Sequence, residues 1–260
     1  MIFADTHAHL YLEDFDSDRD EMIRRALNAG VRYLFLPNID QGSIGDLLRM
    51  VKSFPDRCFP MMGLHPTSVG KEFPLALKVV EEELEKNRKM YCAVGEIGID
   101  LYWDKKCIGE QKAVFLRQIE LCSRYDLPAV IHTRNSFDLV ASLIEEEGKP
   151  GLKGIFHCFS GEIEQARRAV KLGFLLGIGG VVTFKKSGLQ KVVQAIPLEH
   201  LVLETDAPYL APVPFRGERN ESSYIPVIAR KIAEIKDIPL SKVAETTTSN
   251  ALNLFQIANY

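Results

Sequence analysis

The sequence predicts an α/β protein that folds as a TIM-type (β/α)8 barrel, and three observations lead to this prediction. Short apolar segments alternate with amphipathic segments along the 260 residues. Most of the apolar segments are rich in Val, Ile, Leu and Phe and lack polar alternation, as strands buried on both faces do. Finally, metal-binding residue types stand at the end of five of these segments, where a barrel of this class assembles its site.

The individual elements follow from this alternation. The expected strands cover residues 2–7, 31–37, 58–64, 91–96, 127–132, 153–157, 173–178 and 200–205. The expected helices cover residues 17–29, 43–53, 74–87, 109–125, 136–147, 162–171, 187–195 and 224–236. Residues 240–257 are expected to form two further short helices, with Ser249 and Asn250 capping the second. Residues 97–108 and 207–223 lack a clear period, so we expect them to be loops that shape the substrate site.

An open, doubly wound sheet is the alternative arrangement of the same elements. The positions of the metal-binding residues favour the barrel, because they follow the first, fourth, fifth, sixth and eighth strands. In a closed ring these strand ends surround one point, whereas the outer strands of an open sheet lie far apart. The length suits one barrel, so residues 1–260 are expected to form a single domain.

Composition sets limits on the function. Hydrophobic residues make up 46% of the chain and the formal net charge is −3, so a generally basic nucleic-acid binder is not indicated. Any phosphate recognition is therefore expected to be local or supplied by bound metal. The five cysteines are scattered and form no CxxC pair, no signal peptide precedes the first strand, and no segment has membrane-spanning length. We expect a cytoplasmic protein.

The segment Asp5-Thr6-His7-Ala8-His9 is the most informative in the chain. Side chains alternate along a strand, so His7 and His9 are expected to point the same way and to supply half of a metal site. The other half is expected from the ends of later strands, at Glu96, His132, His157 and Asp206. Four imidazoles and two carboxylates can bind divalent cations of the borderline or hard class.

Several segments together resemble the TatD family of metal-dependent deoxyribonucleases. They are Asp5–His9, Gly63-Leu64-His65-Pro66, Val94–Asp100, Ile131-His132-Thr133-Arg134, His157–Gly161 and Leu203–Pro208, with further agreement at Val182–Lys186, Arg216–Glu221 and Thr248–Phe255. The resemblance runs from residue 3 to about residue 257. The chain departs from the family pattern at Asn135, where an acidic residue is usual, and at Ser222, where proline is frequent.

The resemblance implies a hydrolase of the amidohydrolase type that cleaves phosphodiester bonds, usually in DNA, at single strands or ends. It implies one or two divalent metal ions. His7, His9 and Asp206 would hold one ion and His132 and His157 the other, with Glu96 between them. Zinc, manganese, cobalt, nickel or iron suits such ligands, and magnesium suits them less well.

Catalytic roles are expected for two of these residues. Glu96 could hold both ions through one carboxylate, and Asp206 could orient a water molecule and accept its proton. Substrate contacts are expected from His65, Arg134, Arg216 and Asn220, which lie near the same strand ends. Glu204, two residues before Asp206, is a candidate partner for a ligand histidine.

Two other functions remain open at this level. The first is hydrolysis of a carboxylic ester or amide, for example by an aminoacyl-tRNA deacylase, because barrels with these ligands serve both chemistries. The second is a non-enzymatic binding protein that retains an inert barrel.

Overall fold

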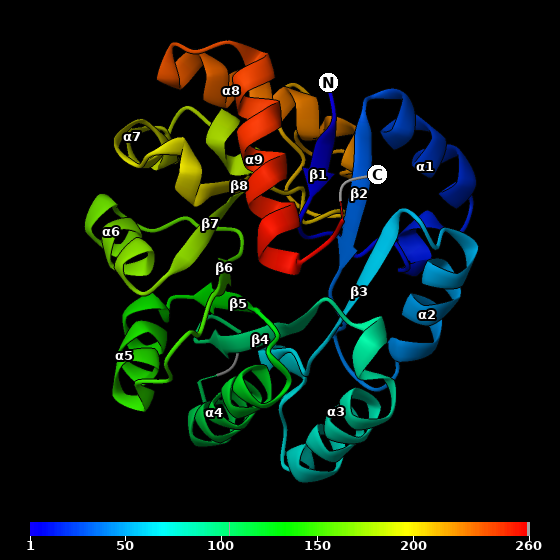
Figure 1. Ribbon diagram of the computed structural model, residues 1–260, viewed down its shortest axis with the longest axis vertical. Coiled ribbons are helices and arrows are strands. Elements are labelled where there is room, and N and C mark those ends of the chain that lie inside the picture. Colours follow the sequence, from blue (N-terminus) through cyan, green and yellow to red (C-terminus); the bar gives the residue numbers. More distant parts are fainter. Residues whose placement is uncertain (104, 259–260) are drawn as a thin grey trace.

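The computed structural model describes residues 1–103 and 105–258 and shows eight parallel strands in chain order around a barrel (Figure 1). The strands are β1 (Phe3–Asp5), β2 (Val31–Leu36), β3 (Cys58–Met62), β4 (Ala93–Asp100), β5 (Ala129–Arg134), β6 (Gly154–Phe156), β7 (Phe174–Ile178) and β8 (Leu201–Leu203). The ring closes between β8 and β1, where the Thr6 amide donates to the carbonyl of Leu203 at 2.9 Å. The barrel prediction is therefore confirmed and the open sheet is excluded.

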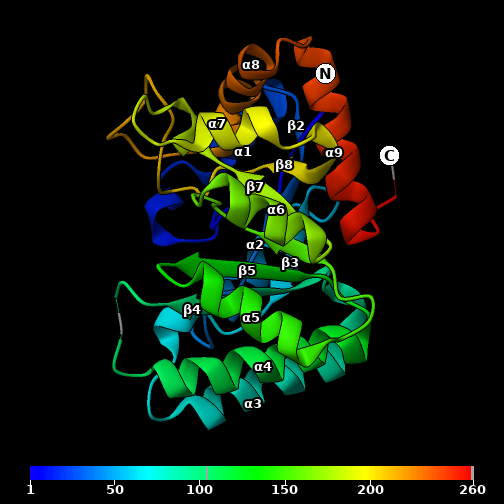
Figure 2. The same cartoon turned by 90° about the vertical axis from the view of Figure 1, so that its left-hand side faces the viewer.

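Helices cover the outside of the ring, as Figures 1 and 2 show. They are α1 (Arg19–Asn28), α2 (Ile44–Ser53), α3 (Phe73–Asn87), α4 (Ile108–Tyr125), α5 (Phe137–Glu147), α6 (Ile163–Lys171), α7 (Leu189–Ala195), α8 (Ile225–Lys236) and α9 (Leu240–Phe255). None of them, within the described residues, has the length and apolar character needed to cross a bilayer.

The prediction of two short helices after residue 240 is wrong, because α9 is continuous. Asn250 does not cap a new helix. Its side-chain amide instead donates to the carbonyls of Leu198 and Leu201 at 3.0 and 2.8 Å, which ties α9 to the start of β8. Asparagine often caps the start of a helix, but the side chain of Asn250 has partners elsewhere in the fold. The sequence pattern does not reveal those partners.

The apolar core has two layers. The larger layer fills the space between the strands and the surrounding helices, and it includes Phe3, Leu34 and Phe156. The smaller layer fills the barrel itself, with Ala4, Val130 and other inward residues of the strands. The C-terminal end of α9 packs onto this inner layer, so the end of the barrel where the strands begin is closed.

Strand β4 differs from its prediction, which ended it at Glu96. The strand continues to Asp100, and its pairing with β5 shifts register between Val94 and Ile97. Ala93 belongs to the inner core layer, whereas Ile97 belongs to the outer one, so the alternation of faces changes between them. An extra residue in a strand has this effect, and it turns the side chain of Glu96 toward the barrel axis. Gly95 permits the turn, since a Cβ there would lie 2.8 Å from the Cβ of Val130.

Phe255 tests whether α9 is a structural closure of the barrel. Its ring stacks on Phe35 with centroids 4.2 Å apart, and both side chains are buried. We expect Phe255→Ala to lower the free energy of unfolding by about 3–5 kcal/mol, the usual cost of emptying an aromatic site in a core. Chemical denaturation measures this change. Leu75→Ala, at an exposed position of α3, is the control and should shift stability by less than about 0.5 kcal/mol. A loss as small as that of Leu75→Ala would contradict the closure.

Candidate metal centre

The six predicted metal-binding side chains lie together at the end of the barrel where the strands finish. His7 and His9 follow β1, His157 follows β6 directly and Asp206 follows β8. Glu96 and His132 lie within β4 and β5. Residues from opposite ends of the chain meet here because β1 and β8 are neighbours. The amide of Asp206 donates to the carbonyl of His7 at 2.9 Å, and this bond fixes the two ligand segments against each other.

The carboxylate of Glu96 lies at the centre of the cluster, and its two oxygens face different histidines. Oε2 lies 3.1 Å from Nε2 of His7 and 3.5 Å from Nε2 of His9. Oε1 lies 2.8 Å from Nδ1 of His132 and 2.9 Å from Nε2 of His157. One carboxylate thus divides the cluster into two halves with a pair of imidazoles in each.

Asp206 lies against the first half. Its Oδ1 atom is 3.8 Å from Nε2 of both His7 and His9. The ring of His157 also stacks on that of His7, with centroids 3.7 Å apart, so the two halves are in direct contact. Asp206 and His132 are the most exposed of the six side chains, at 15% and 16%, so solvent reaches the cluster mainly at these two residues.

His65 belongs to the same cluster, although the sequence predicted it only as a substrate contact. Its Nε2 atom lies 3.1 Å from Oε1 of Glu96, and its ligand atoms group with those of Glu96 and His132. His65 is therefore a seventh candidate ligand. Its other ring nitrogen accepts a hydrogen bond from the amide of Thr67 at 3.2 Å, which fixes the orientation of the ring.

The chemistry of the donor set fits divalent cations. Ring nitrogens converge in both halves, at 3.3 Å between His7 and His9 and at 3.4 Å between His132 and His157. A neutral imidazole offers one lone pair, which can bind a cation. Several such nitrogens around one buried carboxylate can all bind cations, whereas they form poor hydrogen bonds with one another. Three overlapping groups of three residues place their donor atoms within 4.8 Å of one another: His7, His157 and Asp206; His7, His9 and Glu96; and His65, Glu96 and His132.

The electrostatics of Glu96 and His7 agree with this interpretation. Burial opposes ionisation of Glu96, but the neighbouring His65 and His157 outweigh it and hold its pKa well below the ordinary range. Burial, aided by the charge on His157, lowers the pKa of His7 well below its usual value. An ionised carboxylate and a neutral imidazole are the forms that bind a metal. Burial raises the pKa of Asp206 to about 6. For His132 and His157, burial opposes protonation, but the nearby carboxylates of Glu96, Asp100 and Glu204 outweigh it and raise the pKa of both rings as long as no cation offsets the carboxylate charge.

Three polar side chains support the histidines from behind. Oδ2 of Asp100 lies 3.0 Å from Nε2 of His132, and the hydroxyl of Tyr11 lies 3.1 Å from Nδ1 of His9. Sequence reasoning missed both. The spacing of Asp100 could have indicated its role. It stands four residues after Glu96, so the two side chains lie on the same face of a strand that continues to Asp100.

The third supporting residue is Glu204, which the sequence suggested as a partner for a ligand histidine. The side chain is fully buried, and its Oε1 lies 3.6 Å from Nδ1 of His157. The carboxylate also accepts a hydrogen bond from the amide of Cys158 at 2.5 Å. Gly177 makes the room for this group, since a Cβ there would lie 2.1 Å from Oε2 of Glu204.

Asp5 organises the backbone beneath the cluster. Its carboxylate accepts hydrogen bonds from the amide and hydroxyl of Thr205, at 2.9 and 2.6 Å. Ser222, at the position where the family often has proline, donates to the same carboxylate at 2.7 Å. Ser222, which departs from the family pattern, thus forms a buried hydrogen bond that joins β1 to the segment after β8.

The remaining predicted substrate residues lie in different environments. Arg134 is exposed at the end of β5, and Arg216 is exposed with its guanidinium 4.7 Å from the ring centroid of Phe184. Asn220 is fully buried, and its amide donates to the carbonyls of Thr205 and Tyr209 at 2.7 and 2.6 Å. Asn220 therefore braces the loop after β8 and does not face the cavity. Its side-chain donors are already committed to the backbone.

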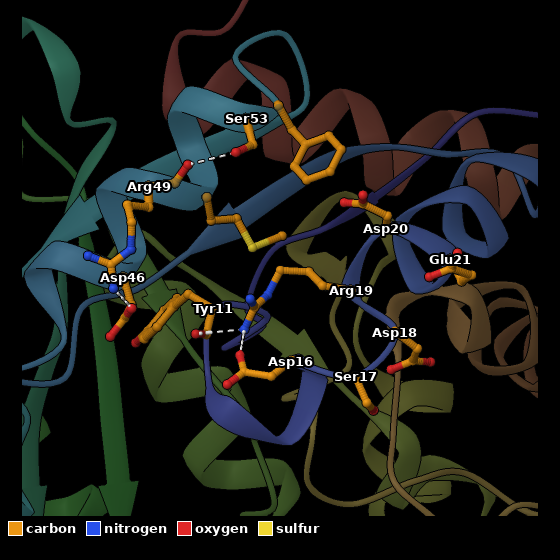
Figure 3. A pocket seen from close by; sticks show the side chains of 12 residues that line it. Tyr11, Asp16, Ser17, Asp18, Arg19, Asp20, Glu21, Asp46, Arg49 and Ser53 are labelled. Carbon is orange, nitrogen blue, oxygen red and sulfur yellow. Dashed lines mark hydrogen bonds and ion pairs between the residues drawn. The ribbon is translucent and has the colours of Figure 1, made fainter.

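A separate hollow lies beside the centre, between the segment after β1 and α2 (Figure 3). Tyr11 lines it, and its carbonyl accepts a hydrogen bond from Arg19 at 3.1 Å. Much of its acidic lining is paired, Asp16 with Arg19 and Asp46 with Arg49. Because arginines neutralise these carboxylates, the hollow does not offer a second metal site.

Known proteins are similar to this chain in sequence and in fold. Residues 4–256 match the family described as TatD related DNase. A Bacillus subtilis protein named uncharacterized metal-dependent hydrolase YabD is 39% identical over 99% of this chain and 100% of its own. Human deoxyribonuclease TATDN3 is 32% identical over 97% of this chain and 94% of its own. The crystal structure of Escherichia coli YjjV, a TatD homologue, superposes with a TM-score of 0.92 at 30% identity and covers 98% of both chains.

Glu96→Gln tests the centre directly. The substitution keeps the size of the side chain but removes the charge that both halves share, so we expect the affinity for divalent cations to fall by about 100-fold or more. Calorimetric metal titration measures the affinity, and the thermal midpoint of the metal-free protein should be recorded with it. Unchanged metal affinity in a folded variant would rule out Glu96 as a ligand.

Proposed function

Since this chain belongs to the TatD related DNase family and is a metal-dependent hydrolase, we propose that it cleaves phosphodiester bonds in DNA with two divalent cations. The observation that carries the proposal is the position of Glu96, whose two oxygens face separate sets of histidines. The human relative that is 32% identical is named a deoxyribonuclease, which supports DNA as the substrate.

The chain's residues divide into two ligand sets. His7, His9 and Asp206 would hold one cation, His132 and His157 the other, and Glu96 both. His65 is close enough to Glu96 and His132 to complete the second set. Imidazole-rich sets favour zinc, manganese, cobalt, nickel or iron over magnesium. Such ions, when bound, offset the phosphate charge and lower the pKa of water.

Asp206 is the residue we assign to proton transfer. It is one of the two most exposed of the six side chains, so water can reach its carboxylate, and a carboxylate can accept a proton from water. A base in this position can orient an attacking water and take its proton. Asp100 and Glu204 keep the His132 and His157 rings in place while this happens.

We further propose that the substrate is single-stranded DNA or DNA ends and that the chain acts as one domain in the cytoplasm. The metal-binding side chains are mostly buried among the strand ends, and a flexible single strand can bring a phosphate to them more readily than an intact duplex can. The five cysteines are free, which suits a reducing compartment.

The decisive experiment is degradation of end-labelled single-stranded and duplex oligonucleotides across a series of divalent metals. The metal-free protein is the control. Metal-dependent cleavage that is faster on single strands supports the proposal. If no metal gives DNA cleavage but an aminoacyl ester or an amide is hydrolysed, the carboxylic ester or amide alternative replaces it. Absence of turnover on all of these substrates favours an inert binding protein.

Asp206→Asn separates proton transfer from metal binding. The amide oxygen can still bind a cation, but it cannot accept a proton, so we expect turnover to fall by roughly 100- to 10,000-fold. Turnover at saturating metal and bound metal per protein are measured on the same sample. Near-normal turnover at saturating metal would refute the assignment.

DNA affinity should depend strongly on metal and only weakly on salt. The chain has a net charge of −3, so the positive charge at the cavity must come mainly from bound cations. Few phosphates are then neutralised, and each contributes a log–log salt slope of only about 0.7 for single strands. Binding of a non-hydrolysable oligonucleotide, with and without metal over a salt series, measures both effects. Tight metal-free binding with a steep slope would contradict this mode of binding.

A further inference from the structure

Two aromatic side chains project into solvent beside the metal centre. Tyr102 and Trp103 follow β4 and are 54% and 68% exposed. Their rings meet edge to face, with centroids 5.0 Å apart. The guanidinium of Arg134, at the end of β5, lies 4.0 Å from the centroid of Tyr102 and 5.3 Å from that of Trp103. We call these three residues the aromatic platform.

Asp100 connects the aromatic platform to the metal centre. Its Oδ1 accepts hydrogen bonds from the amides of Tyr102 and Trp103, both at 2.8 Å. Its Oδ2 contacts the His132 ring at 3.0 Å. One carboxylate therefore holds a candidate metal ligand with one oxygen and the backbone of the aromatic pair with the other. A ligand seated on the platform is within a short reach of a group bound at the centre.

Packing of the loop does not account for these side chains. A buried aromatic residue removes 150–250 Å² from water and contributes to stability in proportion, whereas Trp103 is mostly in contact with solvent. Arg134 forms no ion pair with any residue in the described ranges. An exposed aromatic pair with a guanidinium over its rings provides both a stacking surface and a positive charge.

We propose that the aromatic platform stacks an unpaired nucleobase of the strand whose phosphate lies at the metal centre. The inference rests on the proposed function and names the part of the DNA that the site recognises. Every base has a flat π face, so stacking of this kind tolerates any sequence. A base inside a duplex is already stacked and paired, so the platform discriminates in favour of single strands or frayed ends. Arg134 adds attraction for the adjacent phosphate.

Trp103 is the only tryptophan in the chain, so its fluorescence reports directly on the platform. The titrant is a short phosphorothioate oligodeoxynucleotide, which resists hydrolysis, and the matched titrant has the same backbone with abasic residues. Each is added to the metal-free protein and to the protein with zinc, one of the ions that imidazole ligands favour. We expect quenching by the base-containing strand and little by the abasic strand. Equal effects of the two strands, or no quenching in either condition, would overturn the proposal.

Substitutions at Trp103 provide a second readout. We expect Trp103→Ala to raise KM for single-stranded DNA on the order of tenfold with little change in kcat, while Trp103→Phe restores most of the loss. Leu75→Ala, on α3 with 64% exposure, is the control for removal of an exposed apolar side chain. An abasic substrate should be cleaved equally by all four proteins. If Trp103→Ala matches the wild type on base-containing strands, the platform has no role in binding.

Failure of this inference can be told apart from failure of the proposed function. Quenching that requires bases, in a protein that cleaves no DNA with any metal, keeps the platform and removes the deoxyribonuclease function. Metal-dependent cleavage without quenching, together with normal activity of Trp103→Ala, keeps the deoxyribonuclease function and rules out the aromatic platform.

Discussion

One buried carboxylate organises the functional end of this barrel. Five of the six histidines of the chain have a ring nitrogen within 3.5 Å of a Glu96 oxygen. One of them lies within β5, and the other four follow β1, β3 and β6. A buried charge costs several kcal/mol unless it is paired, so the position of Glu96 requires these imidazoles or a cation between them. The register shift in β4 exists at the point where this side chain must turn inward.

The remainder of the fold keeps the imidazoles fixed around that carboxylate. Hydrogen bonds from Thr205 and Ser222 to Asp5 hold the first strand against the last. Asp100, Tyr11 and Glu204 lie behind individual rings, and Gly177 leaves space for one of them. At the opposite end, the C-terminal part of α9 seals the inner core. The barrel is therefore apolar at the end where the strands begin and polar at the end where they finish, which is where the metal-binding side chains lie.

The surroundings of the centre are as informative as the ligands. Arg134 and Arg216 both lie over aromatic rings, and both side chains are exposed; among residues 1–103 and 105–258 neither of them has an ion-pair partner. Asn220, in contrast, is buried, and its side-chain amide donates both hydrogen bonds to the backbone of the loop after β8. Residues of the same loop therefore have different functions, and burial is what separates them.

The sequence by itself determined the barrel, the approximate strands and helices, and the ligand types at their ends. These follow from local patterns: apolar runs, helical periodicity and the placement of His and carboxylate residues. The tertiary structure decided what no local pattern contains. In the structure, β4 continues to Asp100 and the C-terminal segment forms one helix. His65 joins the ligand cluster, whereas the Asn220 amide binds backbone carbonyls of the loop after β8. Each of these outcomes depends on a partner outside the local sequence, such as β5 for Asp100 or the start of β8 for Asn250, and only the folded chain brings these partners together.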